Sequence, residues 1–460
     1  MMNAFALLVP LMLATPGPHA VEGADLVVWA PKLEALAHLH GFLGPASERS
    51  VLMQPRSYAP DFHPLFTVDP FQPEALTPLG IDPAGPATLS RRGRGQFICT
   101  GVQDAARFEK AAKEKLEAAG NLGATKVQGV TVHTSSLEGH PIAAYVLRGG
   151  EACAWAGGTL SPAQMAEFAK LPGHVSAEAQ KALQGVTGVV RVRTRGLAVG
   201  FDGRGSALIA EGHTTEQRMS LALVPAAPTP FAGLVPSGLF FARMRVTPSS
   251  LAAFIKVQVQ SGCEACDDAA MAQQLEGMAQ VLTGEAVVRI DHLEPGASLS
   301  RAAARLNALR FGMVVEAQDA AKARQYVDAL ARTSPAHSTG DGALVPLDAG
   351  ELRVEAHGRL ISIGNDPLAL QALAPVLVAK AVAVSHSLEA RADPALAARA
   401  LRQISLMDVI GSRELAGLFA FGTEFGPLLG TSEVLEAWAQ PQGNGTQFHL
   451  RWALKPGVTP

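Results

Sequence analysis

Gln103-Asp104-Ala105-Ala106-Arg107 follows an apolar, strand-like run, and Gln318-Asp319-Ala320-Ala321-Lys322 follows a second run of the same kind. In both stretches the aspartate stands where a helix would begin. Its short side chain can accept a hydrogen bond from a backbone N–H of the first helical turn. The two stretches therefore predict one local arrangement twice, a strand followed by a capped helix.

The surroundings of these stretches match in order and spacing. Pro31, at an expected helix start, lies 73 residues before Asp104, and Pro248 lies 71 residues before Asp319. Proline suits the first helical position because no hydrogen bond is lost there. Strand-like segments follow each capped helix, and each series ends in a hairpin with Asp202-Gly203 or Asn444-Gly445 at its turn. We therefore expect an internal repeat.

The expected fold class is α+β, with two related halves, each an antiparallel-rich sheet with helices packed on one face. The expected organisation is a signal peptide at 1–20, a first half at 24–224, a Pro-rich linker at 225–238 and a second half at 239–460. The linker is indicated by four prolines and two glycines between Val224 and Gly238.

The N-terminus resembles a secretory signal. Met1 to Ala20 contains no Asp, Glu, Lys or Arg, and an apolar run from Ala4 to Ala14 precedes Pro16. A cut after Ala20 fits this outline, although it places Pro18 at the third position before the cut. The run is too short for a spanning helix, which needs about 20 residues. We expect an exported, periplasmic or extracellular protein without a transmembrane segment in the mature chain.

Composition argues against nucleic-acid binding. The formal net charge is −3, from 38 basic and 41 acidic residues. The densest basic cluster, Arg91-Arg92-Gly93-Arg94, precedes a strand-like run and is predicted to be a strand connection. A nucleic-acid partner normally requires a larger basic surface. The expected partner is an unidentified envelope or extracellular component.

The signal-like N-terminus, the helix start at Pro31, the Leu79-Gly80-Ile81-Asp82-Pro83 turn and the matched halves resemble a family of exported bacterial proteins of unknown function. The resemblance covers most of the mature chain. It implies no catalytic residues, because none are assigned in such a family.

Two of the four cysteines are placed by the internal match. Cys99 lies five residues before Asp104, and Val314 holds the matching position five residues before Asp319. Cys153 aligns near Ile361 of the second half. Both counterparts are apolar, which predicts core-facing strand positions for the cysteines. An oxidising compartment favours pairing. We predict a Cys99–Cys153 disulfide, with two free buried thiols as the alternative.

Cys263-Glu264-Ala265-Cys266 has the spacing of a redox motif. The segment before it is predicted to be helical, whereas a thioredoxin-like site needs a buried strand there. Neighbouring acidic residues also oppose thiolate formation. We therefore predict a structural disulfide between Cys263 and Cys266, and an active redox pair is the alternative.

Histidine pairs do not predict a metal site. His38 and His40 are two residues apart on an expected helix and would point to nearly opposite sides. Asp61 and His63 lie in a Pro-rich stretch that is predicted to be an ordered loop. No metal or cofactor is therefore expected.

The sequence favours a non-catalytic exported protein that acts as a binding or structural component of the cell envelope or extracellular space. One alternative is a thiol redox protein that uses Cys263 and Cys266. Another is a carrier for a small molecule or lipid, which would need an apolar cavity.

Overall fold

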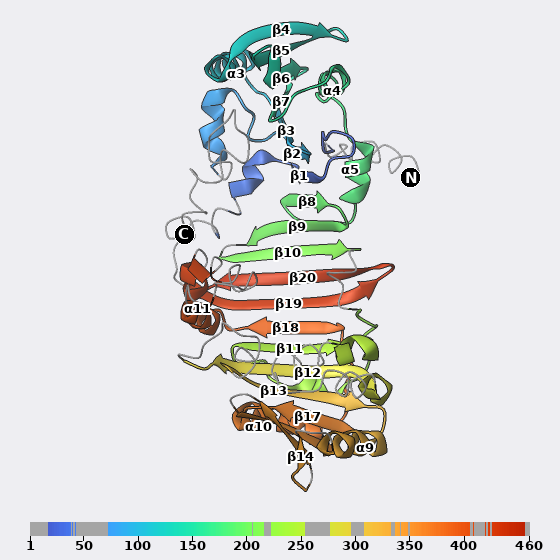
Figure 1. Ribbon diagram of the computed structural model, residues 1–460. Helices are drawn as coiled ribbons and strands as arrows, with labels where there is room; N and C mark the ends of the chain where they lie inside the picture. The colour runs from blue at the N-terminus through green and yellow to red at the C-terminus, as the bar shows by residue number, and fades with distance from the viewer. Residues whose placement is uncertain are drawn as a thin grey trace, which may run out of the picture. The chain divides into compact units, whose positions relative to one another are not determined.

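A computed structural model (Figure 1) describes residues 17–37, 39, 42, 72–204, 206–215, 222–253, 277–295, 308–332, 336–340, 342–347, 350–404, 408, 419, 422–423 and 426–455. The chain divides into two compact units, residues 1–213 and residues 214–458. We call them the first unit and the second unit.

The first unit is built on antiparallel strands whose hydrogen-bonded order is β4-β5-β6-β7-β3-β2-β1-β8-β9-β10. The strand bounds are β1 Leu26–Ala30, β2 Ala87–Arg92, β3 Gly95–Gly101, β4 Asn121–Val127, β5 Val130–Leu137, β6 His140–Arg148, β7 Glu151–Ala156, β8 Val190–Thr194, β9 Leu197–Arg204 and β10 Ala207–Thr214. Its helices are η1 Leu33–Leu36, η2 Pro73–Leu79, α3 Ala105–Ala119, α4 Pro162–Phe168 and α5 Ala177–Ala182.

The second unit has the strand order β14-β15-β16-β17-β13-β12-β11-β18-β19-β20, which is the order of the first unit with each number raised by ten. The strand bounds are β11 Phe240–Arg245, β12 Leu282–Leu293, β13 Leu309–Ala317, β14 His337–Ser338, β15 Gly342–Leu347, β16 Gly350–His357, β17 Leu360–Gly364, β18 Leu388–Ala392, β19 Ser432–Gln442 and β20 Gly445–Leu454. Its helices are η3 Pro230–Gly233, α9 Ala320–Ala331, α10 Pro367–Leu373, η4 Ala374–Val378 and α11 Pro394–Gln403.

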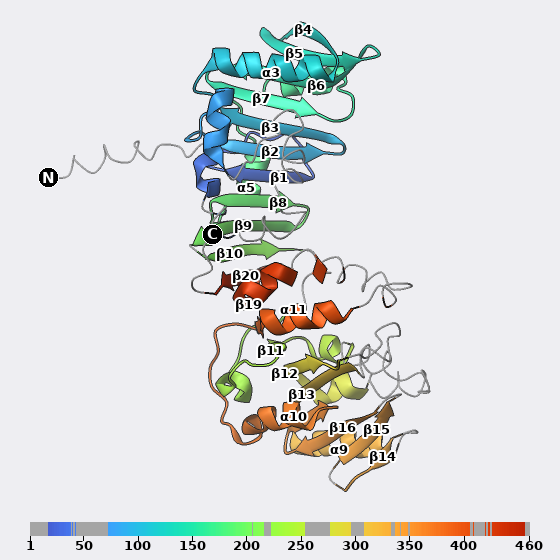
Figure 2. The ribbon, with the colours of Figure 1, turned by 90° about the vertical axis from the view of Figure 1, so that its left-hand side faces the viewer.

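The sheet of the first unit is covered on both faces. On one face Ile98 of β3 packs in a cluster with Phe108 and Leu116 of α3, and Figure 2 shows this helix lying along β4–β6. The neighbouring residue Cys99 belongs to a second cluster, together with Phe168 of α4. Because successive side chains of a strand point to opposite faces, the two clusters lie on opposite sides of the sheet.

The second unit repeats this layering. Val315 of β13 packs with Ala323 and Val327 of α9, whereas its neighbour Val314 packs with Leu373 of α10. Val314 and Val315 are 1% and 0% exposed, respectively, so both faces of the strand are closed to solvent.

The predicted fold class, two related α+β halves with helices packed on one face of each sheet, is therefore wrong. Antiparallel sheet dominates the described residues, and helices cover both sides of it. Consecutive apolar residues such as Phe97-Ile98-Cys99 and Met313-Val314-Val315 are typical of strands buried on both faces, whereas one-sided burial gives alternation.

The predicted helix caps are confirmed. The side chain of Asp104 accepts a 3.0 Å hydrogen bond from the backbone N–H of Arg107, and Asp319 accepts one of 2.7 Å from Lys322. Each satisfies one of the free donors in the first turn of its helix. The caps fix where α3 and α9 begin relative to β3 and β13.

Gly80 lies in the turn that contributed to the family resemblance. Its φ of +78° is in the left-handed region, and a Cβ placed there would stand 2.4 Å from the carbonyl oxygen of Asp104. The carbonyl of Gly80 also accepts hydrogen bonds from the N–H groups of Gln103 and Asp104. Only glycine allows this contact between the turn and the start of α3.

The Pro-rich segment before β11 packs against the second unit. It contains η3, whose Phe231 is 1% exposed, and Thr229, which is fully buried. No helix among the described residues is both long and apolar enough to cross a membrane.

Candidate functional site

The predicted Cys99–Cys153 disulfide is confirmed, with an S–S distance of 2.07 Å. The cysteines are directly opposite each other on β3 and β7. They are 3% and 0% exposed, so the bond lies within the core. Such a buried bridge fits a structural role, because thiol exchange requires access to a sulfur.

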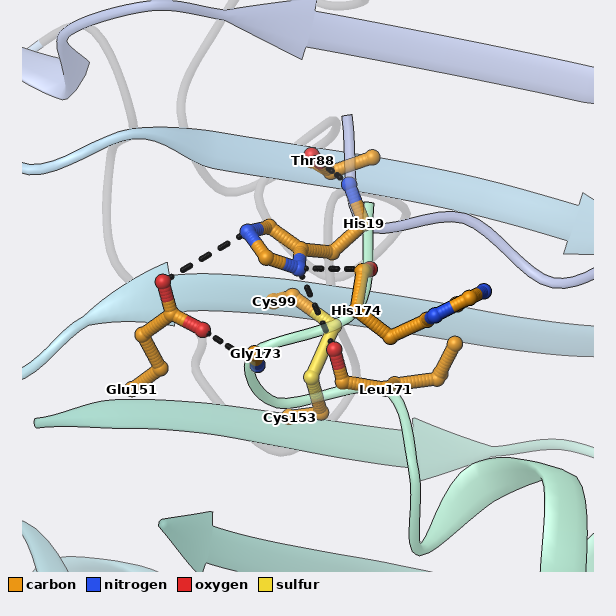
Figure 3. The surroundings of a disulfide bond; sticks show 8 residues. All are labelled: His19, Thr88, Cys99, Glu151, Cys153, Leu171, Gly173 and His174. Carbon is orange, nitrogen blue, oxygen red and sulfur yellow. Dashed lines mark hydrogen bonds and ion pairs between the residues drawn. A yellow bond between two sulfur atoms is a disulfide. The ribbon is translucent and has the colours of Figure 1, made fainter. Parts of the chain in front are cut away.

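A buried histidine lies beside this disulfide, as Figure 3 shows. His19 Nδ1 lies 2.8 Å from the carbonyl oxygen of His174 and 3.1 Å from that of Leu171. A carbonyl oxygen only accepts, so Nδ1 carries a proton and donates. His19 Nε2 lies 3.5 Å from Glu151, whose other oxygen accepts a 2.6 Å hydrogen bond from the N–H of Gly173.

The other residues singled out from the sequence fall in two groups. Arg91-Arg92-Gly93-Arg94 forms the end of β2 and its turn into β3, as predicted, and Asn444 lies in the β19–β20 turn. Cys263, Cys266, His38, His40, Asp61 and His63 lie outside the described residues.

The site that we consider functional is a groove of about 330 Å³ in the second unit. We call it the β18 groove. The strands beneath it are β11, β18, β19 and β20, and η3 with the segment after it forms its wall. It is lined by Phe231, Ala232, Leu234, Pro236, Phe241, Arg243, His386, Glu389, Ala390, Arg391, Glu436, Ala437, Trp438 and His449.

The strand register places the polar lining in two rows on one face. In one row Arg243 pairs with Glu389, which pairs with Trp438. In the other row Arg391 of β18 pairs with Glu436 of β19. Because residues two apart on a strand share a face, both rows point into the same groove.

A buried cation anchors the first row. The Arg243 side chain is 3% exposed, and its Nη2 lies 2.9 Å from a carboxylate oxygen of Glu389. The same Nη2 donates to the backbone carbonyl of His386 over 3.1 Å. Glu389 is held further by His386 Nδ1 at 3.4 Å. These contacts orient the carboxylate and the imidazole together.

Three rings stack beside this ion pair. The His386 ring lies on Trp438 with centroids 4.3 Å apart and planes 16° apart. Trp438 stacks in turn with His449 of β20, with centroids 5.3 Å apart and planes 1° apart. Stacking on both sides holds the indole in place as a flat wall of the groove.

Arg391 is the unsatisfied charge of the groove. It is exposed, and no described residue forms a hydrogen bond or an ion pair with its guanidinium group. Its cross-strand neighbour Glu436 is occupied by Arg451, whose Nη1 donates to it over 2.8 Å. The guanidinium group can therefore bind a carboxylate or phosphate from solution.

The first unit has a larger and more open hollow of about 640 Å³ that includes Glu109, Lys113, His133 and Arg148. His133 stacks on Tyr145 with centroids 4.6 Å apart. Burial, and secondarily the charge of Lys113, lower the pKa of His133. Glu109 and Lys113 pair with each other at 3.6 Å. This hollow lacks the apolar wall of the β18 groove.

No group of three or more potential metal-binding side chains is found in the described part of the chain. Comparisons with protein-family models, with curated proteins and with solved structures found no match to this chain. The assignment of the β18 groove therefore depends on its own geometry.

Sequence reasoning did not find this groove. One signal was available. The hairpin with Asn444-Gly445 at its turn was predicted, and alternation along its first strand would have placed Glu436 and Trp438 on one face. The pairing of β11 with β18 was not predictable from local patterns, since Arg243 and Glu389 are 146 residues apart.

Proposed function

We propose that this chain is an exported, non-catalytic binding protein and that the β18 groove takes a small amphipathic ligand with an anionic group. The observation that carries the proposal is the Arg391 guanidinium, which pairs with no described residue and lies beside an apolar wall. A lone cation at the edge of an apolar groove favours a ligand with one anionic end and one apolar end. Export is supported by the signal-like N-terminus.

The contacts assign a role to each side of the groove. Phe231, Leu234 and Pro236 would bury the apolar part of the ligand, and the edge of Trp438, whose faces are stacked on His386 and His449, would border it. Arg243 and Glu389 neutralise each other and would keep the floor rigid. The size of the groove is at the lower end of ligand sites, which favours a compact ligand over a whole lipid.

Binding of simple carboxylates tests the proposal. The probes are phenylacetate and octanoate, each compared with its uncharged amide, and Trp438 fluorescence or the melting temperature reports binding. We expect the carboxylates to bind and the amides to bind much more weakly. Arg391→Gln should weaken carboxylate binding about tenfold or more, because a charge-assisted hydrogen bond contributes roughly 1.5–3 kcal/mol.

Arg353→Gln is the matched control. Arg353 lies on β16 outside the groove, so this variant should bind as the unchanged protein does. Equal binding of acid and amide, or no binding of any probe, would contradict the assignment of the groove.

We also infer that the shared strand order arose from an internal repeat, and that the protein belongs with exported proteins of duplicated architecture. The support is the agreement of nine successive strand neighbours in each unit, from β4–β5 to β9–β10 and from β14–β15 to β19–β20. The alternative of a redox protein rests on Cys263 and Cys266, and no described residue bears on it.

A further inference from the structure

The segment that precedes β1 is part of the core of the first unit. His19, Ala20 and Val21 are 6%, 2% and 2% exposed, respectively. Ala20 and Val21 belong to the same apolar cluster as Phe168 of α4. Burial of this kind is typical of residues that the fold requires.

The backbone of this segment is held by hydrogen bonds to distant elements. The carbonyl of Pro18 accepts a 2.9 Å bond from the N–H of Ser176, the residue that caps α5. The N–H of His19 donates to the Thr88 hydroxyl on β2 over 3.1 Å. The N–H of Glu22 donates over 2.9 Å to the carboxylate of Glu167 on α4.

The His19 ring connects the segment to the connection between α4 and α5. Figure 3 shows the ring between Glu151 and the carbonyl groups of Leu171 and His174, next to the disulfide. Removal of the ring would leave the carbonyl of His174 without this donor, whereas the carbonyl of Leu171 would keep its 3.0 Å bond from the N–H of His174.

We propose that the mature protein keeps His19 and that signal peptidase cleaves the chain upstream of Gly17, at the bond between Ala14 and Thr15. This inference rests on the export in the proposed function. Water would hydrolyse that peptide bond to give a carboxylate on Ala14 and a free amine on Thr15. A cut after Ala20 would instead remove the buried ring.

The sequence around the two bonds agrees with this choice. Ala14 supplies the small residue required just before the cut and directly follows the apolar run. The third position before the cut does not separate the two bonds, because Met12 stands there for the cut after Ala14 and Pro18 for the cut after Ala20. Gly17 also lies directly against Val175, since a Cβ there would stand 2.3 Å from a methyl carbon of that residue.

The N-terminus of the exported protein tests the inference. The full-length chain is produced in a Gram-negative host, and the envelope and cytoplasmic fractions are analysed by intact mass and N-terminal sequencing. We expect the exported form to begin at Thr15. An exported form that begins at Val21 or keeps Met1 would overturn the inference alone, whereas retention of the whole chain in the cytoplasm would overturn the export proposal as well.

Two further measurements do not require fractionation of the cells. Purified chains that begin at Thr15 and at Val21 should differ in melting temperature. The shorter chain should melt at a lower temperature because the buried contacts are lost, and equal melting temperatures would overturn the inference.

Ala14→Leu should cause unprocessed precursor to accumulate, whereas Ala4→Leu, within the apolar run, should not. Normal processing of Ala14→Leu would also overturn the inference.

Discussion

The two units have the same strand order, but the facing positions on their third strands are joined in different ways. In the first unit Cys99 faces Cys153, and the two form a covalent bond. In the second unit Val314, at the same distance from its helix cap, faces Ser362. Val314 packs against Leu373 of α10. One strand arrangement is thus held by a covalent bond in one place and by apolar packing in the other.

The units also differ in what lies before their first strand. The segment before β1 places the polar ring of His19 among backbone carbonyls. The segment before β11 places the apolar ring of Phe231 in a cluster with Phe241. The second unit has the rows of paired charges and stacked rings of the β18 groove. The comparison teaches that the shared strand order sets the layers, while individual side chains determine chemistry.

The largest expected effect comes from a difference between α3 and α9 in the side chain that packs on the sheet. Phe108 lies four residues after Asp104 and is 1% exposed, whereas Ala323 occupies that position after Asp319 and is 0% exposed. Phe108→Ala should destabilise the first unit by roughly 3–5 kcal/mol, because it leaves a cavity between α3 and the sheet. Urea unfolding with hydrogen exchange of each unit measures the effect.

Glu117→Ala is the control for that variant, because Glu117 is exposed on the same helix. It should change stability by less than about 0.5 kcal/mol. A loss of protection in the second unit equal to that in the first would contradict the assignment of Phe108 to a core of the first unit.

A smaller effect is expected from the disulfide. Replacing both Cys99 and Cys153 by serine should lower the stability of the first unit by roughly 2–4 kcal/mol, because the bond closes a long loop. Reductant should then have no further effect on the first unit. Denaturant midpoints with and without reductant provide the measurement.

The reciprocal variant sharpens the comparison. Val314→Cys with Ser362→Cys places two thiols at directly facing positions of the second unit. We expect a bond to form on oxidation, visible as a loss of free thiol, since facing strand positions bring the Cβ atoms within bonding reach. Two thiols that stay reactive under oxidant would show that the facing positions differ in geometry.

The helix caps should behave alike in the two units. Asp104→Ala and Asp319→Ala should each cost about 1 kcal/mol, because each removes one side-chain acceptor from a first turn. The double variant should show the sum, since the caps lie in different units. Chemical denaturation of the three variants checks this, and a strongly non-additive result would show that the units are coupled.

The smallest expected effect is a pH dependence confined to the first unit. The pKa of His133 is lowered, first by burial and then by Lys113, so the folded state binds its proton less readily than the unfolded chain. The stability that comes from keeping His133 neutral in the folded state is present above about pH 6.5. It is lost as pH falls through the lower pKa of His133 in the folded state. His133→Gln should remove this part of the acid dependence, as measured by melting temperature against pH.

Local patterns predicted both caps and most strands. The hairpin turn predicted at Asp202-Gly203 was wrong, because these residues lie within β9, which continues to Arg204. Asp104 and Asp319 were identifiable because a short acidic side chain after an apolar run is typical of a helix start. The sequence match aligns Cys153 with Ile361, whereas the strand register aligns it with Ser362. The side-chain period of a strand is two, so a one-residue difference exchanges the faces. The disulfide was nevertheless predictable because both cysteines lie in strongly apolar runs.

The layering and the groove were not predictable in the same way. Whether a second helix layer covers a strand depends on elements far along the chain, such as Phe168 opposite Phe97. The ring stack likewise combines His386, Trp438 and His449 through the pairing of three strands. Local propensity carries little information about such long-range pairing.

The position of β1 within its sheet has a consequence for folding. Leu26 pairs with Arg91 of β2 on one side and with Thr194 of β8 on the other. The second partner emerges from the ribosome more than 160 residues after β1, so the strand must wait for most of the unit to be synthesised. Such a high contact order slows folding. Under the proposed export, this delay would give the chain time to pass the membrane before it folds.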